Sequence, residues 1–283
     1  MKTLLRSVLA ALVVTWAVPA LAQSRPLATE DPETVPTGFI LLEGGFDYAR
    51  DARFPASGLE GRFWRVGTFG LSVGVGSIAE LQIDGSLRDS LTITLADPLA
   101  PLNPPALLVG DSTSSFGDLM VGAKVRFVSE TVSRPAVAVR FATRLPGADR
   151  DSGLGLQTMD FQWGIGIAKT VQSVRVAGNA GFALLGDPVA AGEASHAMTY
   201  GFSVARAVAQ GVEIVGELNG RFALGDEVVP VGGEDRSVVR IGSRYTRGPV
   251  RLDGAFLLGI TEHDPTWGFT AGLTWVFRAF SVQ

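Results

Sequence analysis

Cysteine is absent from this chain of 283 residues, and histidine occurs only twice. Without cysteine the protein has neither a disulfide framework nor a thiolate metal site. A further absence concerns hydrophobic runs. After residue 22, none approaches the roughly 20 residues that a membrane helix needs, although 46% of the chain is hydrophobic and the mean hydropathy is +0.27. The formal charge of −4 also argues against nucleic acid as a partner.

The apolar run that does exist lies at the start of the chain. Lys2 and Arg6 precede an apolar stretch over residues 8–18, and small residues follow Pro19. This order predicts a secretory signal peptide over residues 1–22. An uncleaved membrane anchor is the alternative, but the stretch is short for a membrane span. We therefore expect an exported protein.

The rest of the chain consists of short segments in which apolar and polar residues alternate. Between residues 212 and 222, apolar residues and glycine occupy the even positions, whereas Glu213, Glu217 and Arg221 occupy odd ones. Several segments reach the 9 to 11 or so residues that a tilted strand needs to cross a bilayer. Because only helices and closed barrels satisfy their backbone in lipid, the sequence predicts an all-β, antiparallel up-and-down transmembrane β-barrel. A soluble periplasmic lipid-binding barrel is a minor alternative.

We count about twelve strands, and ten or fourteen remain as alternatives. The connections alternate in length, with long ones at 51–60, 96–114, 146–155, 186–195, 224–235 and 262–265. Short periplasmic turns and longer outer loops are typical of membrane barrels. The predicted organisation is a signal peptide over 1–22, a periplasmic N-terminal segment over 23–37 and an outer-membrane barrel over 38–283, with both termini periplasmic. The predicted strands are 38–50, 61–76, 79–95, 115–129, 135–145, 156–170, 173–185, 196–209, 211–223, 236–247, 250–261 and 266–280.

The alternation assigns side chains to the two faces of the barrel wall. Aromatic residues of the last strand should face lipid as part of a girdle; they are Trp267, Phe269, Trp275 and Phe277. Charged residues should face the lumen and pair across strands. The predicted lumen network consists of Glu213, Glu217, Arg221, Arg240, Arg244, Arg251, Asp253, Arg140 and Arg144. Its surplus of arginine favours anionic or π-rich solutes.

No catalytic constellation is recognisable, and we expect neither an enzyme, a metal site nor a cofactor. His263 lies in the string Glu262-His263-Asp264, which looks like a metal or acid–base fragment. Adjacent residues of an extended chain point in different directions, so a solvated loop is the simpler interpretation. The proline-rich loop 96–114 contains apolar residues at 107–109. It either packs on the barrel rim or folds into the mouth as a constriction.

Two stretches resemble a known family. Residues 28–35 (ATEDPETV), with LEGG at 42–45, are similar to the exported proteins named for the meta-pathway of phenol degradation. Residues 116–127 (FGDLMVGAKVRF) also resemble a strand of that family. The similarity in layout extends over most of the chain. It implies a transporter-like outer-membrane barrel that passes aromatic or other hydrophobic compounds.

Two functions are consistent with these features. The first is a passive channel or transporter for small molecules in the outer membrane of a Gram-negative bacterium. The second is a non-conducting structural or adhesive barrel whose lumen is plugged, because side chains fill much of the interior of small barrels. In either case the expected partners are outer-membrane lipids, lipopolysaccharide and the barrel-assembly machinery, and the first adds a small-molecule solute.

Overall fold

The computed structural model describes residues 25–102, 107–190, 192–225 and 231–281, so the predicted signal peptide lies outside the described residues. The described residues form thirteen strands and one short 3-10 turn, η1 (Arg150–Ser152). No helix among them is both long and apolar enough to cross a membrane. The strands are β1 (Phe39–Phe54), β2 (Leu59–Gly74), β3 (Ala79–Ala96), β4 (Ser112–Ser115), β5 (Leu119–Val128), β6 (Ala136–Leu145), β7 (Asp160–Val171), β8 (Val174–Gly186), β9 (Ala194–Ala209), β10 (Val212–Leu224), β11 (Arg236–Arg247), β12 (Val250–Gly259) and β13 (Trp267–Arg278).

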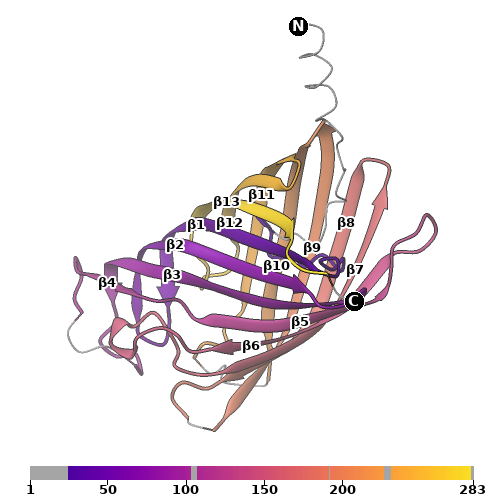
Figure 1. Cartoon of the computed structure of the whole chain (residues 1–283). Coiled ribbons are helices and arrows are strands. Elements are labelled where there is room, and N and C mark those ends of the chain that lie inside the picture. The colour runs from indigo at the N-terminus through magenta and orange to yellow at the C-terminus, as the bar shows by residue number, and fades with distance from the viewer. Residues whose placement is uncertain (1–24, 103–106, 191, 226–230, 282–283) are drawn as a thin grey trace, which may run out of the picture.

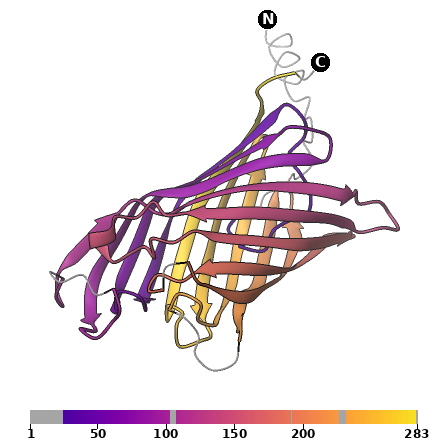
Figure 2. The same ribbon diagram turned by 90° about the horizontal axis from the view of Figure 1, so that it is seen from below.

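Twelve of these strands close into an antiparallel barrel, which confirms the predicted fold class. Each strand of the ring pairs with its neighbour in the chain, and β1 closes the ring by pairing with β13. The short strand β4 pairs only with the outer part of β3 and is not a member of the ring. In Figure 1, β2 to β6 run almost across the view while β8 to β10 run upright, so the two sides of the wall cross steeply. Figure 2 shows the same two sides from below.

The two faces of the wall are the reverse of those of a soluble protein. On β12, Leu252 is 51% exposed on the outside, whereas the neighbouring Arg251 is 3% exposed and faces inward. Phe256 and Leu258 continue the exposed apolar face. An apolar exterior around a charged interior is typical of a barrel that lies in lipid.

Most strand boundaries agree with the alternation, and β11 has the predicted bounds of 236–247. Three predictions were wrong. The strand predicted at 156–170 begins only at Asp160. The connection predicted at 51–60 covers only residues 55–58, because β1 and β2 both continue beyond the alternating region. The strand predicted at 115–129 begins at Leu119; the preceding residues leave the ladder after β4, and the amide of Gly117 bonds instead to the carbonyl of Ser86.

A bulge in β2 changes which residues face the lumen. Gly67 has a φ of +67°, a conformation that side chains disfavour. The register with β1 shifts here, since Gly45 lies opposite Thr68 while Phe46 lies opposite Val66. The extra residue turns Thr68 into the lumen, where strict alternation from Arg65 would place it in lipid.

The aromatic residues predicted for the girdle lie on the outer face of β13. Trp267 and Trp275 lie near opposite ends of the strand, opposite Arg50 and Leu42 of β1. Trp267 packs against Tyr48, with the ring centroids 5.3 Å apart. Further contacts join Phe269 to Phe46 and Trp64, and Trp275 to Phe277.

A charge in the middle of this outer face should destabilise the barrel. Ala271 lies opposite Phe46 and Gly254 on the neighbouring strands, at mid-height of β13. We expect Ala271→Arg to lower the free energy of unfolding by about 2–4 kcal/mol, because the guanidinium would lie in hydrocarbon. Urea titration of the barrel in lipid vesicles measures the change. Ala271→Leu serves as the control and should leave stability unchanged; equal stability of both variants would show that the assigned register is wrong.

Candidate functional site: the lumen and its N-terminal segment

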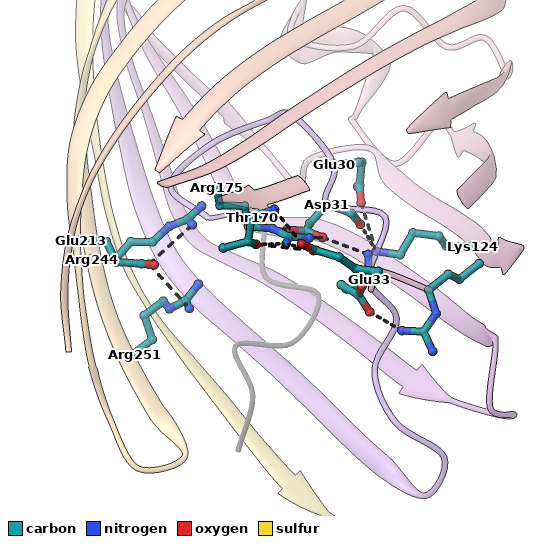
Figure 3. Close-up of polar contacts among 11 residues, drawn as sticks. Glu30, Asp31, Glu33, Lys124, Thr170, Arg175, Glu213, Arg244 and Arg251 are labelled. Carbon is teal, nitrogen blue, oxygen red and sulfur yellow. Dashed lines mark hydrogen bonds and ion pairs between the residues drawn. The ribbon is translucent and has the colours of Figure 1, made fainter. Parts of the chain in front are cut away.

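The residues predicted for the lumen network do face the interior, in several separate groups. Glu217 pairs with Arg240 of the next strand at 2.5 Å, and the same guanidinium donates to Asn219 at 2.6 Å. Glu213 lies 4.0 Å from both Arg244 and Arg251, as Figure 3 shows. These pairs join β10, β11 and β12 across the inner wall.

The other predicted residues have different partners. Arg144 bridges Asp118, which immediately precedes β5, to Asp160 of β7, and its Nε donates to the latter at 2.7 Å. Arg140 donates to Gln82 of β3 at 2.7 Å. Arg221 lies 4.0 Å from Glu234 in the loop before β11. Asp253 lies opposite Arg244 in the ladder, but its carboxylate is 3.6 Å from Arg25, outside the strands.

Arg25 belongs to a stretch that sequence reasoning did not place in the lumen. Residues 25–38, hereafter the N-terminal segment, run along the inner wall. The Arg25 guanidinium donates to Thr68 and Thr270, at 3.1 and 3.0 Å. The backbone amides of Ala28 and Thr29 then donate to the Glu217 carboxylate at 2.7–3.0 Å. The first half of the segment is therefore held by β2, β10 and β13.

The second half of the N-terminal segment carries three carboxylates, each of which meets a cation of the wall (Figure 3). Glu30 lies 3.3 Å from Arg140 and 3.5 Å from Lys124. Asp31 takes two hydrogen bonds of 2.6 Å from Arg175, and Glu33 pairs with Arg126. Strands β5, β6 and β8 supply these cations, so the two halves together bridge opposite sides of the barrel.

Apolar contacts reinforce the polar ones. Val35 is completely buried and packs with Leu41 and Val276. Leu27 forms a second cluster with Ala205 and Val215. The segment is thus packed into the lumen as well as bonded to it.

The inner wall has glycine where the segment passes closest. A Cβ at Gly74 would lie 2.1 Å from the carbonyl oxygen of Pro36 and 2.5 Å from that of Val35. At Gly272 a Cβ would lie 2.6 Å from the Arg25 side chain. Glycine at these positions makes room for the segment.

Two carboxylates of the segment, Glu30 and Asp31, are stabilised in their charged form. Burial by itself would raise the pKa of Asp31, but the hydrogen bonds and charge of Arg175 outweigh burial and hold the pKa below its ordinary value. Burial opposes ionisation of Glu30 in the same way, and Arg140 and Lys124 together lower its pKa. Both groups therefore hold the segment as anions at neutral pH.

The lumen beside the N-terminal segment is hollow. A cavity of about 840 Å³ is lined by Arg25 and Leu27 of the segment and by residues of most strands. A second cavity of about 500 Å³ shares Arg25, Asp47 and Arg144 with it. The two cavities are therefore neighbours, and the segment contributes to the walls of both.

The outer loops partly cover the other end. Ala52, Leu59, Phe63, Leu91 and Ile93 form an apolar cluster inside the barrel, and Leu107 and Leu154 from two loops pack against it. Of the apolar residues at 107–109, Leu107 thus folds inward, while the other two stay exposed. The Ser57 hydroxyl fixes the second loop by donating to the carbonyl of Gly153 at 2.7 Å.

The string 262–264 forms a turn. The Asp264 carboxylate accepts hydrogen bonds from the amides of Ser237 and Thr261, at 2.8 and 3.1 Å, and from the Thr261 hydroxyl. His263 lies 3.5 Å from its neighbour Glu262. Across the part of the chain that the structure describes, no three His, Asp or Glu side chains gather as metal ligands would.

Comparison with known proteins supports the fold. No family model matches the sequence, and no curated protein matches it either. Among solved structures, an outer-membrane channel from Pseudomonas putida F1 aligns with a TM-score of 0.60 at 13% identity, covering 87% of this chain and 98% of the channel. The NanC porin aligns with a TM-score of 0.51 at 6% identity, covering 83% of this chain and 98% of the porin. At these identities the likeness shows an outer-membrane barrel fold.

Proposed function

We propose that this protein is a passive outer-membrane channel for small molecules, narrowed by its own N-terminal segment. The observation that carries the proposal is the hollow, charged lumen, with neighbouring cavities of about 840 and 500 Å³. A lumen filled only to brace the wall would leave no such space. The channel and the porin that share the fold support the same function, and so do the two stretches that resemble the phenol meta-pathway family.

The proposal includes a location and an orientation. The exposed apolar wall suits the outer membrane of a Gram-negative bacterium, with lipid and lipopolysaccharide around it and the barrel-assembly machinery as the partner that inserts it. The N-terminal segment meets the C-terminal end of the barrel, because the amide of Ala279 donates to the carbonyl of Gly38. The short turns lie at this same end, which we assign to the periplasm. The proposal assigns no enzymatic activity to the barrel.

Single-channel recording tests the proposal. The protein from residue 23 onward would be refolded in detergent and inserted into planar lipid bilayers. We expect discrete, reproducible current steps. A barrel that inserts in folded form without conducting would favour the second function, a structural barrel plugged by its N-terminal segment, for which the bonds made by Glu217 and Arg175 to that segment are the supporting observation.

Acid should open the channel. The pKa values of Glu30 and Asp31 are lowered in the folded protein. Their ion pairs therefore stabilise the bound segment fully when the pH is above the ordinary carboxyl pKa of about 4. This stabilisation is lost as the pH falls through the lowered pKa values. Arg175, Lys124 and Arg140 would then face neutral acids. We expect single-channel conductance to be larger at a pH below these lowered pKa values than at pH 7.

A pair of substitutions separates this effect from other acid effects. The double variant Glu30→Gln, Asp31→Asn keeps the shapes of both side chains and removes their charges. It should show the larger conductance already at pH 7 and change little on acidification. If it behaves as the unchanged protein does at both pH values, these carboxylates do not hold the segment.

A further inference from the structure

Two arginines of the larger cavity face each other without close neutralisation. Arg221 of β10 lies directly opposite Arg236 of β11, and both line the cavity. The carbonyls of Gly232 and Glu234 hold Arg221, at 2.6 and 3.1 Å, while the Glu234 carboxylate is 4.0 Å away. Among the described residues, Arg236 bonds only to the carbonyl of Arg53, at 3.4 Å. Like charges directly opposite each other destabilise a sheet, so this position suits an anion.

The other arginines of the cavity are matched by carboxylates. Each of them has a carboxylate oxygen at 3.6 Å or less, whereas the carboxylate nearest to Arg221 is 4.0 Å away and Arg236 has no ion pair among the described residues, so the least neutralised positive charge of the cavity lies at this pair. The matched pairs are Arg25–Asp253, Arg53–Glu60, Arg65–Asp89, Arg140–Glu30, Arg144–Asp160 and Arg240–Glu217.

An apolar wall lines the same cavity as the two arginines. Phe54 and Phe63 line the same cavity with their ring centroids 5.5 Å apart, and Leu154 of the inward loop joins them there. The Arg236 guanidinium donates to the carbonyl of Arg53, the residue that immediately precedes Phe54. A cavity of about 840 Å³ is within the range of about 300–1,000 Å³ that holds small ligands in proteins.

We propose that this cavity binds a small amphiphilic monoanion, with its carboxylate or comparable acidic group at Arg221 and Arg236 and its apolar body against Phe54, Phe63 and Leu154. Two guanidinium groups bind a carboxylate by charge-assisted hydrogen bonds, and the aromatic wall replaces water around the rest of the ligand. This ligand class would be the solute of the channel, so the physiological meaning of the site rests on the proposed channel function. Binding of the anion does not itself require the barrel to conduct.

Calorimetric titration of the refolded protein, in detergent and low salt without a carboxylate buffer, tests the site. Benzoate is the probe; benzamide lacks its charge, and acetate lacks its ring. We expect benzoate to bind at least tenfold more tightly than either, a difference of about 1.4 kcal/mol. Equal affinity of the three compounds, or no binding of benzoate, would overturn the proposal even if the channel conducts. Benzoate binding to a barrel that does not conduct would support the site and remove the channel.

Substitutions locate the binding position. Arg236→Gln should weaken benzoate binding at least tenfold, and Arg247→Gln, which removes the same charge from the exposed end of the same strand, should leave it unchanged. Phe63→Leu gives a second test with all charges intact and should weaken benzoate binding while leaving acetate binding unaffected. If Arg236→Gln binds benzoate as well as the unchanged protein does, the anion does not lie at this pair.

Discussion

Removal of the N-terminal segment is expected to raise the single-channel conductance several-fold. The segment crosses the lumen from Arg25, bonded to Thr270, to Val35, whose amide donates to Glu80 at 2.5 Å. A chain that begins at residue 36 keeps Gly38, which joins the two ends of the barrel, but leaves the space of the segment to water and ions. Recording both proteins under identical salt conditions measures the change.

A second variant distinguishes loss of the segment's bonds from loss of its bulk. Residues 23–35 would be replaced by a glycine–serine stretch of equal length, which behaves as a flexible coil. This variant should conduct more than the unchanged protein and fluctuate more between current levels, because nothing holds the stretch against the wall. If the shortened chain conducts no better than the complete one, ions follow a path that bypasses the segment, and its role is to brace the wall.

The architecture of the wall could be predicted from the sequence because most of each transmembrane strand follows the same period of two. On β11 and β12, inward arginines alternate with outward apolar residues, and this fixes both register and orientation. The prediction failed where backbone geometry overrides the period. The bulge at Gly67 depends on one residue leaving the ladder, and the break before Leu119 depends on residues 116–118 leaving it. Neither changes the composition of the strand around it.

The contents of the lumen were predicted only in part. Arginine, glutamate and aspartate at inward positions could be assigned to the interior, but the partners of Asp253 and Arg140 could not, because Arg25 and Glu30 lie in a segment without periodicity. Two signals were present. The acidic run at 30–33 complements the surplus of arginine on the wall, and the glycines at 74 and 272 leave room on the inner face. These signals predict contacts only once the closed barrel is known, because they do not say which strands lie next to the segment.

Replacing Lys124 by methionine should destabilise the barrel by an amount at least comparable to that of Ala271→Arg on its outer face. The ammonium group is buried, 3.0 Å from Glu80 and 3.5 Å from Glu30, and donates to the carbonyl of Asp31 at 2.9 Å. Without it, Glu80, which is 0% exposed, keeps a charge that no other cation of the described residues neutralises by an ion pair. Breaking a buried pair from one side costs about 3–5 kcal/mol, and urea titration in lipid vesicles would measure the loss.

The matching double variant shows whether the loss comes from the stranded charge. Lys124→Met with Glu80→Gln removes both charges, and the glutamine oxygen can still accept the hydrogen bond that Val35 gives to Glu80. Because replacing both partners of a buried pair is often close to neutral, the double variant should regain most of the lost stability. A double variant as unstable as Lys124→Met alone would assign the effect to the lost contacts with Glu30 and Asp31. In that case Lys124 would act as the anchor of the N-terminal segment, and the single variant should also conduct more than the unchanged protein.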